Sequence, residues 1–70
     1  MEYLKVDVPG RDGQDIDVLI NGAPNGKAGQ VLILGKGNIL VSIDLLDAEE
    51  KLVNLCDTTP THPRIVEIKV

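Results

Sequence analysis

The chain has 70 residues, and its 7 basic and 11 acidic side chains give a formal net charge of −4. This length fits one domain over residues 1–70 and lies near the lower limit for a self-sufficient hydrophobic core. Scattered Lys and Arg in an acidic chain exclude a phosphate-binding surface, one Cys excludes an internal disulfide, and no apolar run is long enough to span a membrane. We therefore expect no nucleic-acid partner, no membrane insertion and, because the N-terminus lacks the pattern of a signal peptide, a cytoplasmic location by default.

Six short apolar stretches separated by Gly, Pro and Asn predict strands joined by turns. In chain order they cover residues 3–8, 16–21, 30–34, 39–45, 52–55 and 65–70. Most of them alternate between apolar and polar residues, which is typical of strands with one buried face. The Asn-Gly pairs at 21–22 and 25–26 predict a tight turn, and the acidic stretch 47–51 predicts a polar turn rather than a helix. These features predict an all-β fold, a small antiparallel β-sandwich.

Leu, Ile and Val supply 24 of the 70 residues, and the only aromatic ring is that of Tyr3. Because side chains alternate strictly across a pleated strand, the pattern also predicts which aliphatic residues form the core. The predicted core comprises Leu4, Val6, Ile16, Val18, Ile20, Leu32, Leu34, Ile39, Val41, Ile43, Val53, Val66 and Ile68.

The middle of the chain has the order of a known module. A strand ending in Asn-Gly (18–22), a glycine-flanked turn (26–29), a Leu-Ile-Leu strand (32–34) and an alternating strand that starts with Gly (37–43) follow one another. In this order, over residues 16–55, the chain resembles the PEGA domain. The resemblance implies a prealbumin-like or immunoglobulin-like sandwich. It also implies a non-catalytic module of the kind often attached to bacterial envelope proteins and sometimes suspected of binding carbohydrate.

Three carboxylates lie close together in the sequence, at Asp12, Asp15 and Asp17. Calcium prefers six to eight oxygen ligands, so such a cluster is a candidate cation site. The spacing is not that of an EF-hand, and no bidentate Glu follows at the required offset. The favoured interpretation is solvated carboxylates in and beside a turn, with no bound metal.

Cys56, Asp57 and His62 form the one grouping with nucleophilic or transition-metal character. A closed zinc site needs four ligands and a catalytic thiol needs a nearby base, whereas this chain holds one Cys and one His. The favoured interpretation makes Cys56 a small apolar residue at a strand end and places His62 in a surface loop. The Gly-Lys-Gly sequence at 35–37 lacks the continuation of a phosphate-binding loop and indicates a hairpin turn. We accordingly expect no catalytic residues and no cofactor.

Four aliphatic residues fall on outward positions of the central strands: Leu19, Val31, Ile33 and Leu40. A solvated sheet face normally carries polar residues, so these four predict one exposed apolar patch on adjoining strands. We expect the patch to bind a protein partner or a second copy of the chain in a homodimer. The alternative is that another segment of the same chain covers it.

These observations favour a non-enzymatic interaction or structural module. Two alternatives stay open. One is a small-ligand or carbohydrate-binding domain that uses surface loops, for which Tyr3 is the only aromatic ring available. The other is an accessory subunit that completes an enzyme site in trans, to which Cys56 and His62 would contribute.

Overall fold

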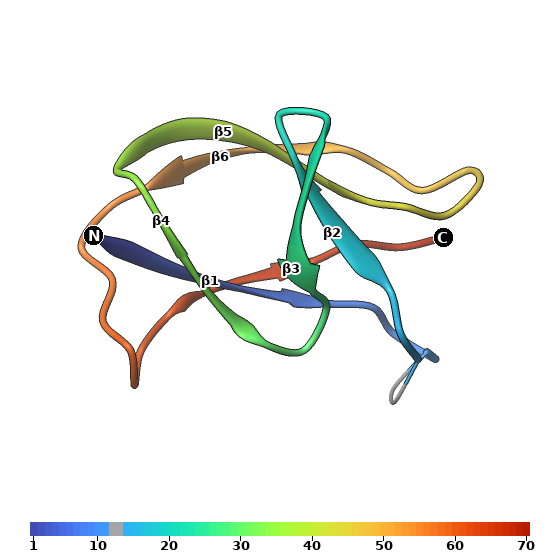
Figure 1. Ribbon diagram of the computed structural model, residues 1–70, viewed down its shortest axis with the longest axis horizontal. Helices are drawn as coiled ribbons and strands as arrows, with labels where there is room; N and C mark the ends of the chain where they lie inside the picture. The colour runs from blue at the N-terminus through green and yellow to red at the C-terminus, as the bar shows by residue number, and fades with distance from the viewer. Residues whose placement is uncertain (12–13) are drawn as a thin grey trace.

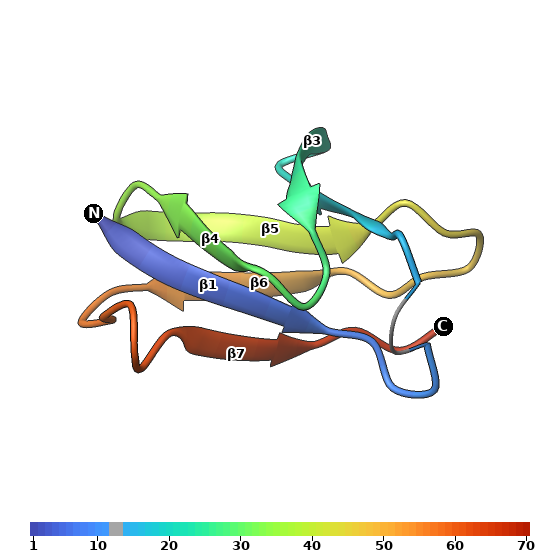
Figure 2. The ribbon, with the colours of Figure 1, turned by 60° about the horizontal axis from the view of Figure 1, so that its bottom comes forward.

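The computed structural model describes residues 1–11 and 14–70 and contains seven strands in two sheets (Figure 1). Sheet A has the strand order β4-β1-β7, and sheet B has the order β3-β2-β5-β6. The described residues contain no helix, and the two sheets pack together as a small all-β sandwich, as the sequence predicts (Figure 2). The strands are β1 (Glu2–Asp7), β2 (Asp17–Ile20), β3 (Ala23–Lys27), β4 (Val31–Leu34), β5 (Gly37–Ile43), β6 (Lys51–Leu55) and β7 (Arg64–Glu67).

The strand β3 is absent from the sequence-based prediction, which assigned its residues to a turn. The turn itself is real but shorter, because Asn21 and Gly22 alone have the positive φ values, 52° and 86°, that a two-residue hairpin needs. The β2–β3 pairing then shifts register between Asp17 and Leu19, which marks a bulge. Gly26 in β3 has a φ of 78°, as the glycine of such a bulge requires. The bulge and the Pro and Gly content of β3 hide its strand periodicity in the sequence.

The central strand of sheet A is β1, and it brings the first and last strands of the chain side by side. It pairs antiparallel with β4 and parallel with β7. The expectation of a wholly antiparallel sandwich is therefore wrong at the β1–β7 pair. A parallel pair needs a crossover of a dozen or more residues, and here strands β2 to β6 supply that crossover without any helix.

The core lies between the two sheets and consists almost entirely of aliphatic side chains. All but two of the predicted core residues are buried; Ile20 and Leu34 are half-buried and pack against the others. Val8 and Leu55 are also buried, although the prediction left them out. Val8 follows the last residue of β1 and Leu55 ends β6, and both continue the two-residue alternation of buried positions in those strands.

Candidate functional site

The structure separates the four residues of the predicted interface into two pairs. Val31 and Ile33 lie on β4 in sheet A and are 44% and 61% exposed. Leu19 and Leu40 lie on β2 and β5 in sheet B and are half-buried. The outer faces of the two sheets point away from each other, so the expectation of one continuous patch is wrong. The residues were placed on the correct side of their strands, but β4 belongs to the other sheet.

The outer face of sheet A carries the more exposed apolar group. Tyr3 of β1 is in register with Ile33 of β4, and Lys5 of β1 is in register with Val31 on one side and Ile65 of β7 on the other. Ile65 is 55% exposed. We call Tyr3, Val31, Ile33 and Ile65 the sheet A patch. Exposed β-branched side chains gathered on one sheet face are typical of an interaction surface.

Two exposed aliphatic residues of the surface are missing from the predicted interface. Ile65 belongs to the sheet A patch, and Leu52 of β6, which is 76% exposed, lies in register with Leu40 on the outer face of sheet B. The signal for both was present in the sequence. Because Val53 and Val66 were assigned to the core, their neighbours Leu52 and Ile65 had to point outward.

An open groove of about 280 Å³ runs between the edge strands β6 and β7. Its walls are residues 51–53 of β6 and residues 64–67 of β7. The two strands lie along the same flank of the sandwich and run in opposite directions (Figure 2). Ile65 belongs both to the groove and to the sheet A patch, so the two features form one continuous surface.

One end of this flank is closed by two hydrogen bonds between Glu49 and Lys69. The Glu49 N–H donates to the Lys69 carbonyl oxygen at 3.2 Å, and the Lys69 N–H donates to Glu49 Oε1 at 3.0 Å. The second bond holds the pKa of the Glu49 carboxyl below its usual value. Beyond this clip no backbone pairing joins β6 to β7 in the described residues, and the groove begins there.

The opposite flank, between β3 and β4, is closed at the turn that joins the two strands. In this short turn the Gln30 N–H donates to the Lys27 carbonyl oxygen at 3.3 Å. Leu32 packs so tightly on Gly26 that a Cβ added there would overlap the Leu32 Cδ2. This contact fills the space beside the turn, whereas the β6–β7 flank is open as a groove.

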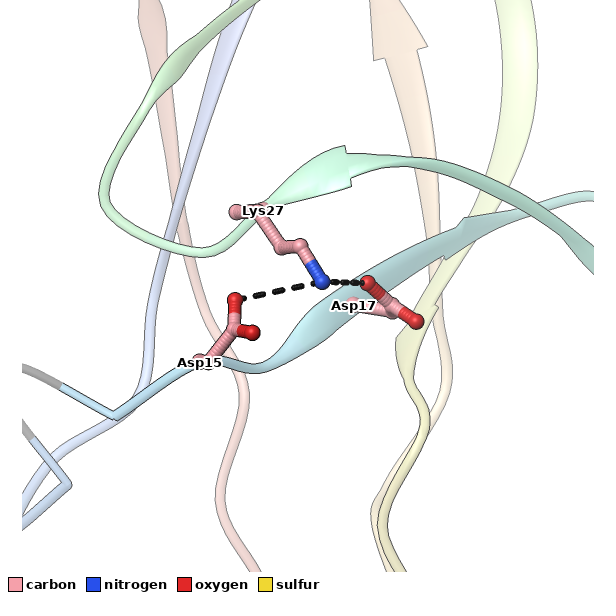
Figure 3. A network of polar contacts seen from close by, with 3 residues as sticks. All are labelled: Asp15, Asp17 and Lys27. Atoms are coloured by element: carbon pink, nitrogen blue, oxygen red, sulfur yellow. Dashed lines mark hydrogen bonds and ion pairs between the residues drawn. The ribbon is translucent and has the colours of Figure 1, made fainter.

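Two carboxylates of the candidate calcium site, those of Asp15 and Asp17, contact a lysine (Figure 3). The Lys27 ammonium donates to Asp17 and lies 3.1 Å from Asp15 Oδ1. These two carboxylates, Asp17 foremost, raise the pKa of Lys27 above its usual value. Asp12 lies outside the described residues. Within residues 1–11 and 14–70, no three potential ligands gather in a way that suits a metal ion, so the cation between Asp15 and Asp17 is the ammonium group.

Cys56 and His62 are placed by a short segment that connects β6 to β7. Cys56 is half-buried and carries a free thiol. His62 is exposed, and its ring Nδ1 is 3.2 Å from the hydroxyl of Thr61. No hydrogen bond joins Cys56 to His62 in the described part of the chain. The surface position predicted for His62 is confirmed.

Comparison of the chain with protein families, curated proteins and solved structures returned no match. The resemblance to the PEGA domain therefore stays a prediction. Among the residues that the structure describes, none form a helix long and apolar enough to cross a membrane.

Proposed function

We propose that this chain is a non-enzymatic interaction module that docks a protein partner on the sheet A patch and the adjoining groove. One observation carries the proposal: Val31, Ile33 and Ile65 are all about half exposed or more, on neighbouring strands of one sheet face. Leaving aliphatic surface in water costs about 25 cal/mol per Å², so a partner that covers it gains stability. A small domain benefits most from such added burial.

The small aromatic surface of the patch supports a protein partner over a sugar. Lys5, in register between Val31 and Ile65, adds a charged group beside the aliphatic side chains. Tyr3 is half-buried and is the only aromatic ring, which leaves little stacking surface for a carbohydrate.

The test combines native mass with affinity capture. The variant Ile33→Lys/Ile65→Lys is compared with the wild type and with Leu46→Lys, which changes a residue that is 87% exposed in a loop outside the patch. We expect the patch variant to fold, to lose the captured partner and to keep a monomeric mass, while Leu46→Lys behaves like the wild type. A wild-type dimer that becomes a folded monomer in the patch variant identifies the second copy as the partner. Equal capture by all three chains, with one unchanged mass, overturns the proposal.

A further inference from the structure

We propose that the groove between β6 and β7 binds an extended segment of a different protein, which adds to sheet A as an antiparallel strand beside β7. The geometry points to a segment with the order basic, apolar, apolar, acidic from its N-terminus to its C-terminus. This inference rests on the proposed interaction function and specifies the chemistry of the partner.

The backbone of β7 offers an unused pairing edge. In the described residues β7 pairs with β1 alone, through residues 64–67, and no strand lies on its other side. The N–H and C=O groups on that side face the β6–β7 flank, where the groove is open. A strand added to a sheet edge satisfies such groups by main-chain hydrogen bonds, while its side chains provide specificity. The clip between Glu49 and Lys69 sets one end of the space that a guest strand occupies.

The charges along β7 define the guest sequence. Arg64 and Glu67 lie at its two ends, and neither belongs to a salt bridge in the part of the chain that the structure describes. Asp7 lies in register beside Glu67 and adds a second carboxylate at that end. Lys51 of β6 also lines the groove there, but its ammonium group is paired with Glu49 at 3.5 Å. An antiparallel guest therefore places a basic residue opposite Glu67 and an acidic residue opposite Arg64. Its two middle residues lie opposite Val66 and Ile65, which favours aliphatic side chains there.

The pattern of β7 itself excludes a second copy as a symmetric occupant with matched charges. Arg64-Ile65-Val66-Glu67 has the required order, and antiparallel pairing of two copies with matched charges would set Ile65 opposite Val66 of the other copy. Residues that oppose each other across an antiparallel pair share a sheet face. Val66 is buried in the core and Ile65 is exposed on the outer face. A twofold axis between the two strands leaves each residue on the same sheet face in both copies, so Ile65 of one copy cannot lie opposite Val66 of the other. The charge-matched register is therefore incompatible with a twofold dimer, whereas a flexible foreign segment meets no such constraint.

The experiment titrates the isotope-labelled full chain with a synthetic peptide whose centre is Lys-Val-Val-Glu, flanked by Gly and Ser, and follows backbone amide shifts by NMR. We expect the shifts to concentrate in residues 51–53 and 64–67 and to leave β3 unchanged. NMR suits the weak affinity of so small an interface. The reversed peptide, Glu-Val-Val-Lys, has the same composition and is expected to bind at least several-fold more weakly. Equal binding of both peptides, or shifts centred elsewhere, overturns the inference.

Reversing the charge at Arg64 and at the peptide position opposite it tests whether Arg64 contacts the acidic residue of the guest. Arg64→Glu is expected to weaken binding of Lys-Val-Val-Glu by about three- to tenfold and to restore binding to Lys-Val-Val-Lys. Lys36→Glu makes the same change of net charge at an exposed residue outside the groove and is expected to change neither affinity. Failure of the second peptide to recover binding overturns the inference. If no peptide binds while partner capture still depends on Ile33, this inference fails and the proposed function stands.

Discussion

Replacing Gly26 by Ala tests the packing that closes the β3–β4 flank. Gly26 has a φ of 78°, where an L-residue costs roughly 1–2 kcal/mol. The new Cβ would also overlap the Cδ2 of buried Leu32, and overpacking of this kind costs about 1–3 kcal/mol. The expected loss in the free energy of unfolding is the sum of the two, about 2–5 kcal/mol. A chain of this length has a total of only about 3.5–10 kcal/mol, so the variant loses a large share of its stability and unfolds if the total lies at the low end of that range.

Urea unfolding followed by circular dichroism measures this loss, and Gly22→Ala is the matched control. Gly22 has a φ of 86°, and a Cβ there would meet nothing within 4 Å. The control is therefore expected to lose only the backbone contribution of roughly 1–2 kcal/mol. The remaining difference of about 1–3 kcal/mol between the two variants reports the contact with Leu32. If both variants unfold at the same urea concentration, the Leu32 side chain moves aside without cost, and its contact with Gly26 does not stabilise the closed turn.

Three further predictions concern the core and two polar contacts. Ile43→Ala is expected to cost about 2–5 kcal/mol because Ile43 is fully packed between the sheets, and a thermal midpoint close to that of the wild type would contradict this. Thr58 donates two hydrogen bonds to Glu2, one from its hydroxyl and one from its backbone N–H, and so lowers the pKa of the Glu2 carboxyl from 4.5. Thr58→Val removes the hydroxyl bond, so that pKa is expected to rise towards 4.5 in an NMR titration and the loss of stability at acid pH is expected to become smaller; an unchanged pKa would contradict the assignment. Asp17, with Asp15, raises the pKa of Lys27 above 10.5. The difference in the free energy of unfolding between the wild type and Lys27→Met is therefore expected to be constant between neutral pH and pH 10.5 and to fall as the pH rises through the raised pKa; a difference that stays constant there would contradict the assignment.

Alternation along the strands was sufficient to predict most of the fold. Leu4, Val41 and Val66 are buried where the two-residue period places them, since a pleated strand allows only two sides. The same period placed Val31 and Ile33 on an exposed face. Each of these inferences needs only neighbouring residues in the sequence.

The features that were mispredicted depend on contacts between distant residues. Alternation does not specify which sheet a strand joins, so β4 was placed beside the strands of Leu19 and Leu40 when it pairs with β1. The parallel pairing of β1 with β7 is equally non-local. The groove is formed by residues 51–53 and 64–67, which come together only through the assembly of both sheets. Its main charged residue, Arg64, gave no signal in the sequence because an isolated basic residue is usually solvated.

The pairing of β1 with β7 has a consequence for the order in which the two sheets form. All strands of sheet B lie between residues 17 and 55, so that sheet forms from one continuous stretch of the chain. Sheet A is completed only when residues 64–67 pair with β1, on the other side of that stretch. Such long-range pairing slows folding. Until it forms, the inner face of sheet B lacks part of its cover, and transiently exposed apolar surface of this kind promotes aggregation.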